Sequence, residues 1–278
     1  MEGQTAKYFF LHFLWALAAL TGLLALHFDG IRPISSLSLM VQTEHFQLFY
    51  APGTDRMAVL TAGSAERAWT ELTAAGYVLP TEKRIEIRLY PDTKTLAQGL
   101  GWEKNEKAMG AYFQKKIAVL SPEMWMDDVT DEKEFDVKGP MLHELVHLLV
   151  DEMTEGNYNR WWTEGMAQFI EKNFHDTQMS QPSEVETFYS LHELEQNFDS
   201  VPVSQSYWQS LLAIEYIAQT YTENALPLIM QQAAARGNFS EGLCEALHCG
   251  WDDLEKGYAA CLKQNSQKIR RSHEREQI

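Results

Sequence analysis

Cysteine and basic residues are both scarce in this chain. Only three cysteines occur in 278 residues, and none of them stands in a Cys-x-x-Cys spacing, which excludes a cysteine-ligated zinc site of the usual kind. The 39 acidic residues outnumber the 23 basic ones and give a formal net charge of −16. This charge argues against binding to nucleic acid and against a polybasic grip on anionic lipid. There is also no internal repeat and no low-complexity tract.

The three cysteines, Cys244, Cys249 and Cys261, lie close together in the sequence. An odd number leaves at least one thiol outside any intramolecular disulfide. A Cys249–Cys261 bridge across a helical hairpin suits an oxidising compartment, and buried thiols fit the same pattern equally well.

Charge is absent altogether from residues 8–28. This stretch of 21 residues is long enough, at about 1.5 Å per helical residue, to cross a bilayer core of about 30 Å. A cleaved signal peptide is the alternative, but the Ala-x-Ala match at Ala16–Ala18 lies in mid-stretch. We therefore expect an uncleaved single-pass membrane anchor, followed by a linker over residues 29–41, with the remaining domain outside the cytoplasm.

The patterning beyond the linker predicts an α+β domain over residues 42–265, followed by a polar tail over 266–278. Alternation of apolar and polar residues indicates strands, and a period near 3.6 indicates helices. The predicted strands are 45–50, 84–90, 109–113 and 116–120. The predicted helices before Gly139 are 55–75 and a short helix that Asp92 caps and that runs through Leu100. Residues 121–138 are predicted to be an acidic loop, and the chain from Gly139 onward is predicted to be helical almost to its end. A small mixed sheet thus precedes a mostly helical half.

The most informative motif is His143-Glu144-Leu145-Val146-His147, within the apolar run 141–150. Histidines four residues apart on a helix lie on one face, one turn apart. Both imidazoles can therefore bind one zinc ion, and Glu144 follows the first of them closely enough to reach a metal-bound water. The alternative interpretation is a pair of core histidines beside a solvated glutamate.

A catalytic zinc ion takes three protein ligands and keeps one position open. Trp161-Trp162-Thr163-Glu164-Gly165-Met166-Ala167-Gln168 opens the next helical run, so Glu164 is the predicted third ligand. Together, the two segments resemble the gluzincin metallopeptidases, and within them the Peptidase MA-like families. The resemblance implies Zn²⁺ bound by His143, His147 and Glu164 at the junction of the sheet and a zincin-like helical half, with Glu144 as general base.

Three further features belong to the same interpretation. Related enzymes stabilise the oxyanion with a Tyr or His from a later helix, and Tyr207 is the best candidate, with Tyr189 and Tyr216 as alternatives. Gln168 stands where some gluzincins carry an aspartate against a zinc histidine, and Glu171 is the nearest substitute. The resemblance also implies an antiparallel edge strand beside the metal, for which the segment 110–120 is the candidate.

The expected function is zinc-dependent hydrolysis of peptide bonds, with a peptide or protein as substrate. Two other functions fit the sequence. One is a noncatalytic binding or chaperone module that keeps the zinc fold, and the other is a zinc hydrolase of a nonpeptide amide. The presence of Glu144 beside all three ligands favours catalysis. The sequence does not set the oligomeric state or the cleavage specificity.

Overall fold

The computed structural model describes residues 36–79, 83–101, 108–127, 129, 131–177, 182, 185 and 187–276, with side chains as far as Asn265. The predicted anchor, residues 8–28, and most of the predicted linker lie outside the described residues. Within the described part, no helix combines the length and the apolar character needed to cross a membrane.

Contacts divide the chain into two compact units. The first comprises residues 1–152 and 170–180, and the second comprises residues 153–169 and 181–278. Helices α5 (Met141–Thr154) and α6 (Arg160–His175) each contribute residues to both units.

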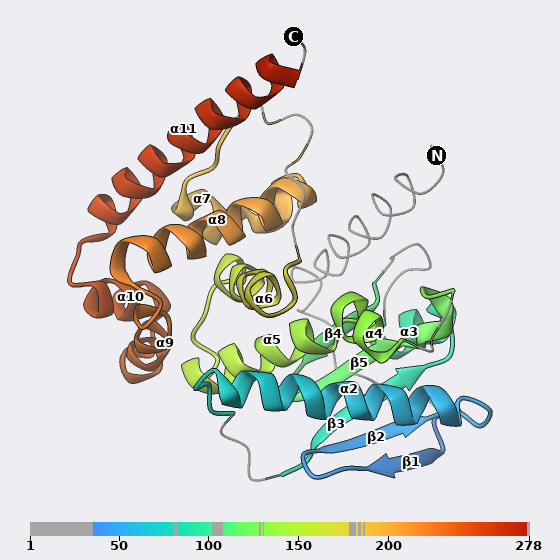
Figure 1. The fold of residues 1–278 in the computed structure, drawn as a ribbon. Helices are drawn as coiled ribbons and strands as arrows, with labels where there is room; N and C mark the ends of the chain where they lie inside the picture. The colour runs from blue at the N-terminus through green and yellow to red at the C-terminus, as the bar shows by residue number, and fades with distance from the viewer. Residues whose placement is uncertain are drawn as a thin grey trace. The chain divides into compact units, whose positions relative to one another are not determined.

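The first unit is built on a five-stranded mixed sheet with the order β1-β2-β3-β5-β4 (Figure 1). Its strands are β1 (Leu39–Gln42), β2 (Phe46–Tyr50), β3 (Ile85–Tyr90), β4 (Gly110–Phe113) and β5 (Lys116–Leu120). The two central pairings, β2–β3 and β3–β5, are parallel, and the outer pairings, β1–β2 and β4–β5, are antiparallel. The predicted mixed sheet is thus confirmed, but β5 is an interior strand, and only β4 of the segment 110–120 lies at an edge.

The strands form where the alternation predicted them. Ile85, Ile87 and Leu89 of β3 are buried, as are Phe46 and Leu48 of β2. Helix α2 (Asp55–Ala74) packs against β2, and α3 (Thr93–Leu100) packs against β3 and β5. The Asp92 carboxylate accepts a hydrogen bond from the Thr95 N–H at 2.8 Å and caps α3, as its position before the helix predicts.

Two predictions for the connecting segments were wrong. The last residues of the predicted linker form β1, because the apolar run Leu39–Val41 pairs with β2 in antiparallel register. The predicted acidic loop contains the short 3₁₀ helix η2 (Pro122–Met124) and helix α4 (Glu132–Lys138). Asp131 caps α4 by accepting from the Glu134 N–H, and the buried Phe135 ring stacks on Trp125 with centroids 5.6 Å apart. Acidic residues that appeared to be a solvated loop thus form the favourable first turn of a helix.

The second unit is helical in all its described elements, as predicted for the chain after Gly139. In addition to its parts of α5 and α6, it contains α7 (Leu191–Asn197), η3 (Phe198–Ser200), α8 (Val203–Tyr221), α9 (Ala225–Arg236), α10 (Phe239–Leu247) and α11 (Trp251–Glu276). The backbone of the predicted polar tail continues α11 as far as Glu276. A small mixed sheet together with this helical content confirms the α+β class.

Candidate metal centre

Helix α5 carries both motif histidines. Nearly every side chain from Met141 to Val150 is buried, as expected of a helix that is apolar on all sides. The rings of His143 and His147 meet edge to face, with centroids 4.7 Å apart. The spacing of four residues therefore places the two imidazoles on one helix face, as predicted.

The first histidine is oriented by a carboxylate. Nδ1 of His143 lies 3.0 Å from Oε2 of Glu171, and both side chains are largely buried. An ionised carboxylate has no proton to donate and can only accept, so Nδ1 carries the proton of this hydrogen bond. Nε2 then remains as the nitrogen that can ligate a metal. The prediction that Glu171 substitutes at this position is confirmed.

Gln168 does not orient His143 and instead forms hydrogen bonds between two helices. Its Nε2 donates to the backbone carbonyls of Glu164 and Tyr207, at 3.0 and 3.1 Å. The amide thus ties α6 to α8 and is not the group that holds His143.

Glu144 is buried against the start of the edge strand. Its side chain is 3% exposed. A Cβ atom added at Gly110, the first residue of β4, would lie 2.7 Å from the Glu144 Oε1 and 3.0 Å from the Glu144 Cγ. Glycine at position 110 is therefore what leaves room for the Glu144 carboxylate.

The β4–β5 hairpin is fastened to the end of α5. Its two turn residues, Gln114 and Lys115, have φ values of 46° and 64°, as in a two-residue primed turn. The Tyr112 hydroxyl donates to Asp151 at 2.5 Å and accepts from the Lys115 N–H. The Lys115 ammonium lies 2.6 Å from Glu152, a hydrogen bond that raises the pKa of Lys115. These contacts hold β4 along the helix that carries Glu144.

Glu164 is placed by a close approach of α6 and α8. A Cβ atom added at Gly165 would lie 2.5 Å from the Ser210 carbonyl oxygen. The absence of a side chain at Gly165 lets the two backbones come this near. One turn away, the Tyr207 hydroxyl donates to Oε1 of Glu164 at 2.9 Å, and both residues are buried. Tyr207, which we predicted as an oxyanion donor, is therefore a direct partner of the predicted third ligand.

A cation also lies beside Glu164. Nε of Arg160 is 3.9 Å from the Glu164 Oε1, and the same guanidinium forms an ion pair with Asp199 and lies over the Phe198 ring. A positively charged guanidinium therefore lies near the Glu164 carboxylate and is held there by Asp199.

His143, His147 and Glu164 come together as a candidate metal site. One ligand atom from each residue lies within 4.8 Å of the other two. Two imidazoles and a carboxylate are the donors that divalent transition metals accept, and the Glu171 bond leaves Nε2 of His143 available. The three predicted ligands therefore fit a metal ion, and in the described part of the chain they are the one group of His, Cys, Asp and Glu that does so.

The alternative tyrosines have other surroundings. The Tyr189 backbone exchanges hydrogen bonds with the Gln209 side chain. The Tyr216 hydroxyl occupies the space that a Cβ atom would need at Gly257. Tyr207 is therefore the one of the three for which the structure records a hydrogen bond to a predicted metal ligand.

Two residues of the site escaped the sequence analysis. Gly110 was assigned only to the edge strand, because nothing in the chain between residues 110 and 144 signals that they touch. Arg160 stands four residues before Glu164, and this spacing on a helix was a usable signal for their proximity.

Comparison with known proteins adds no family assignment. No protein-family model matches the chain, and no curated protein matches it in sequence.

Proposed function

We propose that this protein is a zinc-dependent peptidase of the gluzincin type, in which His143, His147 and Glu164 hold the metal. The observation that carries the proposal is the convergence of these three ligand atoms within 4.8 Å, with Glu144 directly after the first ligand on the same helix. Convergence of residues from two separate motifs is a stronger signal than either motif alone.

The donor set supports zinc as the metal. Two histidines and one glutamate match a catalytic zinc site, which keeps a fourth position open, whereas calcium and magnesium prefer sets made of oxygen alone. When bound, zinc acidifies a water molecule and polarises a substrate carbonyl.

Glu144 is the proposed general base. Its position directly after His143 places a carboxylate beside the metal site, where it takes a proton from water and passes it to the leaving amine. Burial and the close approach of the β4 backbone at Gly110 restrict where this carboxylate can lie. Such restriction keeps a base oriented for each turnover.

Two residues position the ligands. Glu171 accepts from Nδ1 of His143 and fixes the tautomer, while Tyr207 donates to Glu164 and fixes the carboxylate. Partners of this kind typically change metal affinity or activity by about 10- to 100-fold when removed. A tyrosine hydroxyl has one proton to donate, so the predicted role of Tyr207 as an oxyanion donor is the alternative to this positioning role.

Strand β4 supports a peptide as the substrate. It pairs with β5 on one side and forms an edge of the described sheet, and its first residue touches Glu144. A peptide that adds to this edge as a further strand gains backbone hydrogen bonds and runs alongside the general base. A nonpeptide amide gains no such ladder.

The test is digestion of an unbiased peptide library by the purified protein, together with metal analysis. We expect one zinc per chain and cleavage that stops on chelation. Glu144→Gln should keep the zinc and lose at least about 10²-fold in turnover, because an amide does not accept the proton. Glu155→Gln, at an exposed carboxylate just beyond α5, is the matched control and should cleave normally.

Three results contradict the proposal in distinct ways. Full zinc content in His147→Ala would show that the ligand set is wrong. Retained turnover in Glu144→Gln would assign the base to another group. A wild-type protein that binds zinc and peptides but cleaves none would be a noncatalytic module.

A further inference from the structure

The C-terminus of α10 brings two cysteines together through its backbone. The helix ends at Leu247, and His248 follows in the left-handed conformation with φ 50°. The Cys249 N–H donates to the Cys244 carbonyl at 3.2 Å, and the His248 N–H donates to the Glu245 carbonyl at 3.2 Å. These two hydrogen bonds define a Schellman motif, in which the side chains at the positions of Cys244 and Cys249 commonly touch.

The backbone bond also limits how far apart the two cysteines can be. Standard bond lengths on either side of this hydrogen bond allow the two Cα atoms to be at most about 7 Å apart. Disulfides usually span Cα separations of about 4.4–6.8 Å. The two thiols are also close enough to interact electrostatically: burial raises the pKa of Cys244, and the neighbouring Cys249 adds to this rise.

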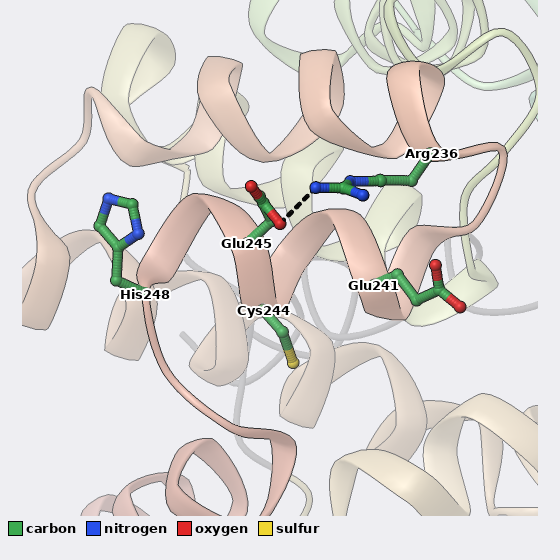
Figure 2. A pocket seen from close by; sticks show the side chains of 5 residues that line it. All are labelled: Arg236, Glu241, Cys244, Glu245 and His248. Carbon is green, nitrogen blue, oxygen red and sulfur yellow. Dashed lines mark hydrogen bonds and ion pairs between the residues drawn. The ribbon is translucent and has the colours of Figure 1, made fainter.

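Both sulfur atoms have defined surroundings. The Tyr221 hydroxyl donates to Sγ of Cys249 at 3.5 Å and holds that side chain against α8. Cys244 lines a solvent-open hollow of about 500 Å³ together with Arg236, Glu241, Glu245 and His248. Its thiol points away from the Arg236–Glu245 ion pair (Figure 2). Cys244 is only half-buried, so its side chain is not enclosed in the core.

Cys261 lies on α11, where the Asn265 amide contacts its sulfur at 3.8 Å. All three cysteines of the chain carry thiols in the structure, so the Cys249–Cys261 bridge considered from the sequence is not formed. No backbone hydrogen bond connects Cys261 to either of the others among the described contacts.

We propose that Cys244 and Cys249 form a redox-active dithiol, which a low-molecular-weight disulfide converts into an intramolecular disulfide. One cysteine thiolate attacks the reagent, RSSR, and releases the first RS⁻ as a mixed disulfide forms. The second cysteine thiolate attacks the protein sulfur of the mixed disulfide and releases the second RS⁻. The two protein thiols lose two electrons and two protons, and RSSR is reduced to two RSH.

The experiment treats the reduced full-length protein with oxidised glutathione in the presence of chelator, blocks remaining thiols with iodoacetamide, and analyses tryptic peptides by mass spectrometry. Trypsin leaves Cys244 and Cys249 in one peptide, Gly237–Lys256, and Cys261 in another, Gly257–Lys263. We expect the first peptide to lose two hydrogen atoms and to carry neither alkyl group nor glutathione.

Variants separate this proposal from its rivals. Cys261→Ser should form the same disulfide, whereas Cys249→Ser and Cys244→Ser should each stop at a mixed disulfide with glutathione. Circular dichroism shows whether each variant is folded. If only one of Cys244→Ser and Cys249→Ser folds, that variant alone is enough for the test. A cross-link between the two peptides, a mixed disulfide that persists in the wild type, or full alkylation of Cys244 and Cys249 would overturn the proposal.

Discussion

The hydroxyl of Tyr207 has two possible roles, holding the Glu164 carboxylate or donating to an oxyanion, and it has one proton to donate. It donates to the Glu164 carboxylate, which favours a role in holding the ligand. A hydroxyl beside a metal ligand is also near the place where an oxyanion develops. The two roles differ in what the loss of the hydroxyl does to the metal.

We predict that Tyr207→Phe weakens zinc binding by about 10- to 100-fold, because Glu164 loses the donor that orients it. Competition with a fluorescent chelator measures the affinity, and turnover at saturating zinc is measured alongside. Tyr221→Phe, which removes another hydroxyl from α8, is the control and should change neither quantity. Unchanged zinc affinity with a loss of about 10²–10³ in turnover would instead assign the hydroxyl to the oxyanion.

Single residues also show what the sequence can predict at this site. The i, i+4 spacing of His143 and His147 fixes their geometry because a helix is a local structure. Gln168 and Glu171 could not be told apart this way, since both lie on the following helix and the choice between them depends on how α6 packs. The sequence offered Glu171 as the substitute, and the structure decides in its favour by placing its carboxylate 3.0 Å from His143.

At the scale of elements, the β4–β5 hairpin and α5 act together. Tyr112 and Lys115 fasten the hairpin to the end of the helix, and Gly110 leaves space for Glu144 at the other end of β4. The edge strand thus limits where Glu144, the proposed general base, can lie.

We predict that Gly110→Ala lowers turnover by about 10-fold or more while the zinc content stays at one per chain. The new methyl group would lie 2.7 Å from Oε1 of Glu144 and 3.0 Å from Cβ of Pro140, so the carboxylate has to move, and small displacements of a catalytic group are costly. Gly250→Ala is the matched control, because an added Cβ there meets nothing closer than 4.0 Å. Normal turnover in Gly110→Ala would show that Glu144 tolerates the shift.

The elements that sequence patterning missed share one cause. Strand β1 and helix α4 are short, and α4 also carries a high local charge, so periodicity over their few residues is weak. Their formation depends on partners elsewhere in the chain, such as β2 for β1 and Trp125 for the buried Phe135. The long apolar elements, whose periods repeat several times, were predicted correctly.

For the whole molecule, a metal that binds only the folded state adds to its stability. Zinc at 100 to 1,000 times its dissociation constant contributes about 2.7–4.1 kcal/mol. For a chain of this size we predict that chelation lowers Tm by about 5–15 °C. Differential scanning fluorimetry with and without zinc measures the shift, and His147→Ala should show none. Equal Tm values for the zinc-loaded and the chelated wild type would argue against a metal held by three protein ligands.

The α+β class and the three candidate ligands could be predicted from the sequence, whereas the close approach of one helix to another could not. Gly165 illustrates this limit. Its position after Glu164 looked like part of a catalytic signature, but its structural role is to let α6 meet the backbone of α8 at Ser210. The residue is required for packing, and the ligand beside it depends on that packing.

Gly165 also has a consequence for how this protein can evolve. The nearest atom that blocks a side chain at this position is the main-chain oxygen of Ser210, at 2.5 Å, and Cγ1 of Ile214 follows at 2.7 Å. Replacing Ser210 with a smaller residue would leave that oxygen in place, so no substitution at the contacted position can act as a suppressor. Compensation would require α8 to shift as a body, and Tyr207 would move with it, away from Glu164. Single substitutions at Gly165 are therefore not expected to persist for as long as the protein needs the Glu164 carboxylate in its present position.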